Sequence, residues 1–179
     1  MFNIFAISLN NMPYELHVKH LVNCSQATAW NFLCDVDNLA ILTPSFLHFQ
    51  TQYKSHDQVK NGVVFVHKIK PFSMIGLTWI SYITQYEQGH SFSDIQLDGP
   101  YKTWIHQHIV EDHQGKGCFV IDKVLFSLKF GLLNSLLYAI VVKPSILKAF
   151  EFRREKIEML FNTKTDFQKN YALHLKKIK

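Results

Sequence analysis

The chain has 179 residues, of which 47% are hydrophobic and 18% charged, a balance that excludes a disordered chain and indicates one globular domain. A chain of this length buries roughly 70% of its unfolded surface and needs no disulfide framework. Its three cysteines show no paired spacing, which also argues against zinc. The net charge of +5 is uneven: residues 143–179 carry ten basic and four acidic side chains, and the remainder carries nine and ten.

The basic C-terminal part comes without a zinc finger, an RNA-binding strand motif or a phosphate loop, so we expect no nucleic-acid partner. Its charge suits a solvated helix face followed by a basic tail, or contact with an anionic surface. Residues 1–11 are apolar but lack the basic residues and small-residue cleavage site of a signal peptide. We therefore assign them to an N-terminal extension and expect a cytoplasmic protein with free thiols.

The first elements are a strand and two short helices. Tyr14–Asn23 alternates apolar and polar residues and predicts a strand. Ser25 is a suitable N-cap for a helix that follows it directly. A second helix should end at Thr43, because Pro44 disfavours helical geometry in the residue before it.

Six further strands follow, separated by short polar or Gly/Pro connections that favour antiparallel hairpins. They are Phe46–Tyr53, Gly62–Lys70, Leu77–Glu87, Ser91–Leu97, Lys102–Glu111 and Cys118–Leu128.

The end of the domain is helical. Lys143–Phe161 carries an apolar stripe, and Pro144 suits a first helical turn. A seven-stranded antiparallel sheet must bury one face, and this helix is its obvious partner. We therefore predict an α+β fold over 12–163, in which the sheet wraps around the long helix, and a basic tail over 164–179. The space between sheet and helix is either filled by side chains or kept as a cavity.

Polar and ionisable side chains recur at alternate positions of the two predicted strands around Gly99–Pro100. A symmetric turn there pairs Asp94 with His106 and Gln96 with Trp104. Side chains two residues apart share one face of a strand, so all four lie on the same side of the sheet.

The next predicted hairpin adds a second carboxylate to this face. If its loop is centred near Gln114, His106 faces Asp122. A row from Asp94 through His106 to Asp122 then crosses three strands, with His108 beside it and both carboxylates within reach of His106.

Three interpretations of this row stay open. It is a satisfied polar network that fixes strand register, a polar patch that orients a ligand in an apolar pocket, or a catalytic or metal site. The sequence supplies no nucleophile in a recognisable context, and the spacing matches no established metal motif. We therefore predict no catalytic residue, no metal and no cofactor.

The stretch FSDIQLDGPYKTWIHQH, with Trp79 before it and DKVLF, FG and FEFRREKIEMLF after it, resembles the ligand-binding branch of the SRPBCC superfamily. That superfamily includes the START, Bet v 1-like and polyketide cyclase proteins. SQATAWNFLCDVDNLAILTP resembles the first two helices of the branch. The resemblance covers Tyr14 to Phe161, and it departs from the pattern at Phe126, where Tyr is usual, and before Gly131, where a proline is missing.

The resemblance implies a helix-grip fold, with a cavity between the sheet and the C-terminal helix, and binding of a small hydrophobic molecule. We predict non-catalytic binding of a lipid, quinone or polyketide-like ligand. One alternative is an enzyme of polyketide cyclase or dehydratase type, using His106 with Asp94 or Asp122. Another is a membrane-associated lipid or quinone chaperone. The predicted ligand-binding residues are Trp79, Asp94, Gln96, Trp104, His106, His108 and Asp122.

Two further features concern the long helix and the connection that precedes it. Phe130–Val142 is the most apolar connection and is too short to span a bilayer. It either packs on the end of the sheet or stays exposed beside the basic C-terminal part, where it would touch a membrane transiently. Arg153 lies closer to the apolar stripe than Arg154, so we expect it to meet a carboxylate of the row. Nothing in the sequence indicates an oligomeric state.

Overall fold

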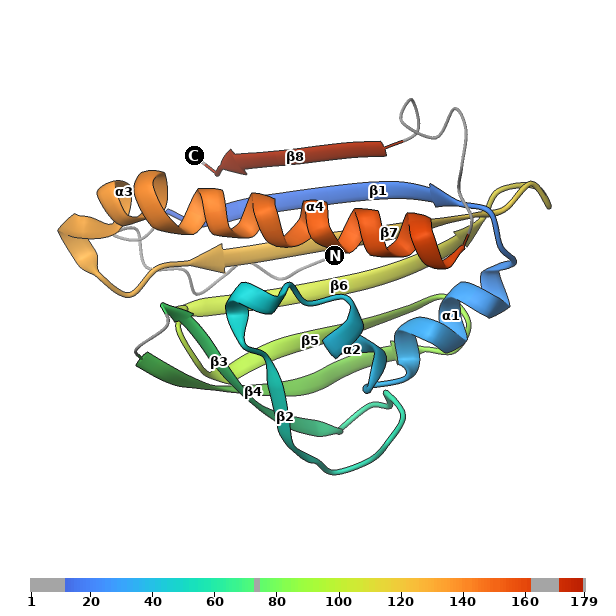
Figure 1. The fold of residues 1–179 in the computed structure, drawn as a ribbon, viewed down its shortest axis with the longest axis horizontal. Helices are drawn as coiled ribbons and strands as arrows, with labels where there is room; N and C mark the ends of the chain where they lie inside the picture. Colours follow the sequence, from blue (N-terminus) through green and yellow to red (C-terminus); the bar gives the residue numbers. More distant parts are fainter. Residues whose placement is uncertain (1–11, 73–74, 162–170, 179) are drawn as a thin grey trace.

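The computed structural model describes residues 12–72, 75–161 and 171–178. These residues build one antiparallel sheet of eight strands in the order β2-β3-β4-β5-β6-β7-β1-β8 (Figure 1). The strands are β1 Tyr14–Val22, β2 Gln50–Lys54, β3 Val64–Phe72, β4 Ile75–Glu87, β5 Ser91–Asp98, β6 Thr103–Asp112, β7 Cys118–Ser127 and β8 Tyr171–Lys177. The predicted extension over 1–11 lies outside the described residues.

Two groups of helical segments accompany the sheet. The first comprises α1 Gln26–Cys34, α2 Asn38–Ile41 and η1 Ser45–Leu47. The second comprises η2 Gly131–Leu133, α3 Asn134–Leu137, η3 Tyr138–Val142 and α4 Lys143–Leu160. Figure 1 shows α4 running along β1 and β7, while the first group lies beside the other strands of the same sheet face. The architecture is therefore the predicted sheet wrapped on a long C-terminal helix.

Local signals account for the first helices. Ser25 caps α1, since its hydroxyl accepts the backbone N–H of Thr28 at 3.1 Å. α1 buries Ala29, Trp30 and Cys34 against the sheet. α2 ends before Thr43, whose hydroxyl donates to the carbonyl of Leu39 at 2.7 Å. Both predicted helices are confirmed.

The long helix begins earlier than Pro144 suggested, because η2, α3, η3 and α4 run on as one helix over Gly131–Leu160. Pro144 lacks an N–H, and its ring clashes with the carbonyl four residues back in an ordinary α-helix. The wider π-helical turn of η3, Tyr138–Val142, lies at that point. The helix therefore passes the proline without ending, and the proline marks a change of helical pitch.

Of the two hairpins that carry the polar row, the register of one was predicted correctly and that of the other was not. β5 and β6 pair as expected, with Asp94 opposite His106. The β6–β7 prediction was wrong by two residues: His108, and not His106, stands opposite Asp122. The loop is centred on Gly115 instead of Gln114, because the backbone of His113 donates to the carbonyl of Gly117 at 2.9 Å and closes a five-residue connection. A two-residue shift keeps each side chain on its predicted face.

The eighth strand corrects both the strand count and the predicted basic tail. β8 pairs with β1 along its whole length, from Tyr171 opposite His20 to Lys177 opposite Tyr14. Tyr171, Leu173 and Leu175 alternate along β8 and pack against the core cluster under α4. The sequence does alternate apolar and other residues over β8, but the lysines around this segment suggested a solvated tail.

Candidate functional site

Five ionisable side chains meet between the sheet and α4. Asp94 comes from β5, His106 and His108 from β6, Asp122 from β7 and Arg153 from α4. The side chains of Asp94, His106 and His108 retain 14%, 12% and 10% exposure, and that of Asp122 retains 4%. The group is therefore buried at the Asp122 end and slightly open at the Asp94 end. We call it the polar cluster.

Asp122 is the centre of the buried end. Arg153 donates from Nε to Asp122 Oδ2 at 3.1 Å and from Nη2 to Oδ1 at 3.3 Å. His106 Nε2 lies 3.0 Å from Asp122 Oδ1 in hydrogen-bonding geometry. His108 Nδ1 lies equally close to that oxygen but out of line, so it has no hydrogen-bond partner within the described residues. Arg153 thus meets a carboxylate of the row, as predicted.

Asp94 occupies the open end. Its Oδ2 lies 3.3 Å from His108 Nε2, within hydrogen-bonding distance, and 3.9 Å from His106 Nδ1, which is too long for a hydrogen bond. The expectation that His106 bonds both carboxylates was therefore wrong for Asp94. The two imidazole rings lie 3.7 Å apart between centroids. Each ring consequently lies between the two carboxylates, with one nitrogen towards each.

The local environment shifts the pKa values of His106 and His108 in opposite directions. Burial lowers the pKa of His106 below its ordinary value, and the nearby charge of His108 lowers it further. Burial acts on His108 in the same direction, but its contacts with Asp122 and Asp94 outweigh it and raise the pKa. Burial opposes ionisation of Asp122, but Arg153 and the two histidines together hold its pKa well below the usual range. The arrangement therefore makes His108 the more readily protonated of the two rings.

The remaining predicted residues lie at increasing distance from the cluster. Trp104 stands edge-on to His106 at 6.3 Å between ring centroids, and Trp79 stands edge-on to Trp104 at 5.1 Å. Gln96 does something else: its amide donates to the carbonyl of Tyr101 at 2.8 Å and accepts from the backbone N–H of that residue at 3.3 Å. Gln96 therefore braces the β5–β6 turn and does not join the cluster.

Neither a protein-family model nor a curated protein sequence matches the chain. Solved structures do. Norcoclaurine synthase from Thalictrum flavum, in complex with dopamine and hydroxybenzaldehyde, superposes with a TM-score of 0.62 at 12% identity, over 93% of this chain and 98% of that one. The chain has the Bet v 1-like helix-grip fold.

Two further helix-grip structures support this assignment. SA2116 from Staphylococcus aureus, a protein of unknown function, gives a TM-score of 0.65 at 11% identity over 87% of this chain and 98% of its own. The di-domain ARO/CYC protein StfQ from the steffimycin biosynthetic pathway gives 0.59 at 12% identity, over 83% of this chain and 52% of that one. These structures are consistent with the SRPBCC resemblance, and identities this low establish the fold alone.

Two side chains of the helix-grip interior were missed as neighbours of the site. Phe150 of α4 faces His106 at 6.1 Å between centroids. Tyr101 packs on both Trp79 and Trp104, and burial raises the pKa of its phenol. Tyr101 follows Gly-Pro directly, so its position after the turn was the available signal.

His67 of β3 is a further missed interior histidine. It is 3% exposed and lies 3.2 Å from the hydroxyl of Thr51. Burial lowers the pKa of His67 to about 4, so the ring is neutral near pH 7. The alternation through Phe65 and Ile69, both buried, placed His67 on the inner face and could have found it.

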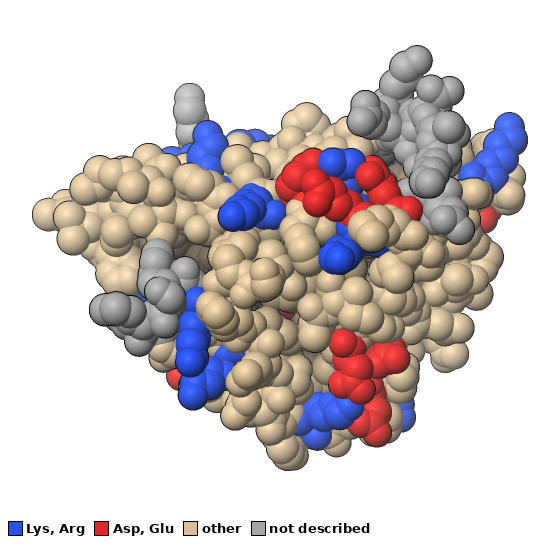
Figure 2. Space-filling view, viewed as in Figure 1, with Lys and Arg blue, Asp and Glu red and all other residues tan. Residues whose placement is uncertain are grey.

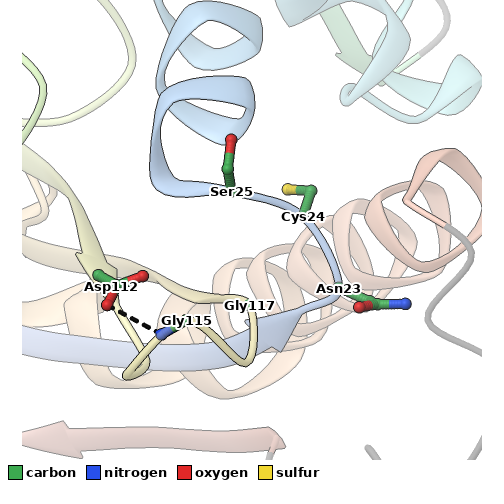
Figure 3. A pocket seen from close by; sticks show the side chains of 6 residues that line it. All are labelled: Asn23, Cys24, Ser25, Asp112, Gly115 and Gly117. Carbon is green, nitrogen blue, oxygen red and sulfur yellow. Dashed lines mark hydrogen bonds between the residues drawn. The ribbon is translucent and has the colours of Figure 1, made fainter.

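Two spaces are found near the inner face and at the end of the sheet. The space beside Asp122 and Arg153, which Tyr171 of β8 also lines, measures about 10 Å³, about the room that one water molecule needs. A larger hollow of about 270 Å³ lies elsewhere, between the start of α1 and the β6–β7 loop (Figure 3). Its lining is mostly exposed and polar or glycine, including Asn23, Ser25 and Asp112, so it does not suit an apolar ligand.

The open end of the polar cluster also has the composition of a metal site. Asp94, His106 and His108 each offer one ligand atom, and the three atoms lie within 4.8 Å of one another. Chemically, the cluster can donate and accept hydrogen bonds, move a proton at His106, or hold a cation at the Asp94 end.

Proposed function

We propose that the protein binds a small, mainly apolar molecule with one polar group, between the inner face of the sheet and α4, without changing it covalently. The observation that carries this proposal is the exposure of the polar cluster. A network that only fixes strand register is best sealed, whereas Asp94 and His106 keep 14% and 12% of their side chains accessible. They do so on a face otherwise made of aromatic and aliphatic side chains. Norcoclaurine synthase, which has the same fold, holds aromatic small molecules in its structure.

Binding requires more room than the space beside Asp122 and Arg153 offers, because pockets for small molecules measure about 300–1,000 Å³ and that space measures about 10 Å³. The C-terminal half of α4 is fixed to the sheet by Arg153 and by the buried Ile157. The helical stretch Gly131–Val142 has no buried residue and contacts the core through Tyr138, which stacks on Tyr14, and Val142. Entry therefore goes by displacement of this first half of the helix, with Phe150 and Trp104 as the first side chains to meet the ligand.

Native mass spectrometry of the protein as purified from its host tests the proposal. We expect a co-purifying mass of lipid, quinone or polyketide size. His106→Phe, which removes the polar end while keeping an aromatic ring, should lose that mass, and His174→Gln on the exposed face of β8 should keep it. Absence of any bound mass, together with no saturable binding of the fluorescent probe anilinonaphthalene sulfonate, would sink the proposal.

A cyclase or dehydratase activity is the second candidate. The specific observation in its favour is the lowered pKa of His106, which leaves a neutral imidazole oriented by Asp122 and able to take a proton. If His106 is a general base, His106→Ala abolishes turnover and leaves fold and ligand affinity largely intact. If it is structural, the same change lowers the melting temperature markedly.

A third proposal, transient membrane contact, rests on the exposed apolar side of Gly131–Val142. Leu132 is fully exposed, and Leu133, Leu136 and Ile140 are 57–67% exposed. No acidic residue occurs in positions 123–150, and lysines flank the stretch at both ends. Figure 2 shows the tip of the molecule at α3 almost without charged atoms. An apolar surface with basic neighbours suits an anionic lipid surface.

Length and packing indicate how such a contact is made. The helix over Gly131–Leu160 is long and apolar enough, by length and composition, to cross a membrane. Its α4 part, however, packs on the sheet through Ile146, Phe150, Arg153 and Ile157. The preceding part, Gly131–Val142, touches the core only through Tyr138 and Val142 among its apolar side chains. It is about 18 Å long at 1.5 Å per residue, shorter than a bilayer core of about 30 Å. We therefore propose that it lies on the membrane surface.

Co-sedimentation with phosphatidylserine-containing vesicles at low salt tests the contact. We expect binding that falls with added salt and is lost in Leu132→Asp/Leu136→Asp. Met159→Asp, an equally exposed apolar position at the other end of the helix, is the matched control and should bind like the wild type. No binding of the wild type to these vesicles would end the membrane proposal.

A further inference from the structure

The geometry points to a divalent transition-metal site at the open end of the polar cluster, with Asp94 Oδ2, His106 Nδ1 and His108 Nε2 as ligands. This inference goes beyond the binding of an apolar molecule and does not depend on it. The three atoms come from two adjacent strands, and their convergence follows from register: Asp94 stands directly opposite His106, and His108 is two residues along the same face.

The ligand atoms are already near the spacing that an ion requires. Bonds of about 2.0–2.2 Å in a tetrahedral site place the ligand atoms about 3.3 Å apart. Asp94 Oδ2 and His108 Nε2 are 3.3 Å apart, and Asp94 Oδ2 and His106 Nδ1 are 3.9 Å apart. All three ligand atoms lie within 4.8 Å of one another, so an ion requires the imidazole nitrogens to close by up to about 1.5 Å through rotation of the rings.

Asp122 supplies the outer support that metal-binding histidines ordinarily have. A histidine that binds a metal through one nitrogen nearly always donates its other N–H to a carboxylate or carbonyl, which fixes the tautomer and the ring orientation. Asp122 Oδ1 lies 3.0 Å from His106 Nε2 and 3.0 Å from His108 Nδ1, the two nitrogens that face away from Asp94. Arg153 in turn holds the carboxylate in place.

One unsatisfied atom is explained by this arrangement. His108 Nδ1 is buried and has no hydrogen-bond partner within the described residues, although Asp122 Oδ1 is close. A buried N–H without a partner is costly. When His108 Nε2 binds an ion, Nδ1 carries the proton of the ring and faces Asp122 Oδ1 as a donor, which is the partner that a metal-binding histidine ordinarily has.

The donor set selects the kind of ion. When both far nitrogens donate to Asp122 and His108 Nε2 gives up the proton that it shares with Asp94, two imidazole lone pairs and a carboxylate oxygen converge, and a cation between them offsets their repulsion. Two imidazoles and one carboxylate suit zinc and its first-row neighbours, whereas calcium and magnesium prefer oxygen ligands alone. Three protein ligands leave one coordination position free, and the partial exposure of Asp94 and His106 gives an ion a route in.

Calorimetric titration of the EDTA-treated, dialysed protein with ZnCl₂ tests the inference, with CoCl₂ as a spectroscopic probe. We expect one ion per chain and the intense visible bands of four-coordinate Co²⁺. Asp94→Asn and His106→Gln should each weaken zinc binding roughly 100-fold or more, since loss of a supporting outer residue alone costs 10–100-fold. Near-ultraviolet circular dichroism verifies that both variants stay folded.

The matched control is the other facing histidine pair, His17 on β1 and His174 on β8, which stand directly opposite each other. The double variant His17→Gln/His174→Gln should bind zinc like the wild type. Unchanged zinc affinity in Asp94→Asn and His106→Gln, or loss of binding in the His17/His174 variant, overturns the site. A protein that carries an apolar mass but binds neither ion refutes the metal site and leaves the proposed ligand binding standing.

Discussion

The buried ion pair between α4 and β7 gives a quantitative test of how the helix is held. Arg153 binds Asp122 through two nitrogens, and the two side chains are 10% and 4% exposed, so water screens the pair little. Removing one partner of a buried pair costs about 3–5 kcal/mol, because the other charge stays buried. Two imidazoles remain near Asp122, so we expect Arg153→Met to cost the lower figure, about 3 kcal/mol.

Urea unfolding at pH 7, followed by circular dichroism, measures this cost. Lys176→Met is the control: Lys176 pairs with Glu15 at the surface, where the two side chains are 70% and 41% exposed, and we expect a loss of about 1 kcal/mol or less. The double variant Arg153→Met/Asp122→Asn should cost less than the sum of its two single changes, since it leaves no unpaired charge. A loss below about 1 kcal/mol for Arg153→Met, with additive behaviour in the double variant, would refute this account of the pair.

Three further predictions concern the scaffold. Gly117→Ala should cost about 2 kcal/mol or more in urea unfolding, because φ is +107° and the new Cβ would stand 2.3 Å from the carbonyl oxygen of Val22; Gly115→Ala, at φ +74° in open space, should cost only about 1 kcal/mol. Burial lowers the pKa of His67 to about 4, against 6.5 in the unfolded chain, so its contribution to the free energy of unfolding is fully present above about pH 6.5 and is lost as the pH falls towards 4. His67→Gln should make the urea midpoint fall less steeply between pH 6.5 and pH 4. Ser25→Ala should lower the free energy of unfolding by about 1 kcal/mol, and an unchanged value would contradict its capping role.

The sequence was sufficient where short-range signals decide the structure. Alternation gave the strands β1 and β3 to β7, Ser25 gave the start of α1, and the Gly99–Pro100 turn gave the register that sets Asp94 opposite His106. The predicted strand Phe46–Tyr53 was wrong at its start, because Ser45–Leu47 forms the helical turn η1 and β2 begins at Gln50. Apolar spacing on the long helix identified Arg153 as the residue that meets a carboxylate of the row. These features depend on neighbours a few residues apart, and such neighbours are visible in the chain.

Prediction failed where the outcome depends on backbone geometry or on packing. The β6–β7 loop takes positive φ at Gln114, Gly115 and Gly117, and nothing in its composition shows which residue lies at the centre. The resulting two-residue error placed His106 opposite Asp122, where the structure has His108, but it kept the same side chains on the inner face. Gln96 was assigned to the site because it lies two residues from Asp94 on the same strand face, yet its amide hydrogen-bonds to the backbone of Tyr101 in the turn. Whether a cavity remains depends on how every core side chain fits, which no local pattern records.

β8 has a consequence for the state of the protein in solution. It covers one long side of β1, a strand whose Leu16 and Val18 are buried, along a row of seven residue pairs. Without β8, the backbone N–H and C=O groups of β1 would lie open to a strand of another molecule. β8 itself presents Lys176 and Lys177, both exposed, and charged side chains discourage such pairing. The C-terminal strand therefore also guards against self-association, and we expect a chain shortened before Tyr171 to oligomerise through β1 in size-exclusion chromatography.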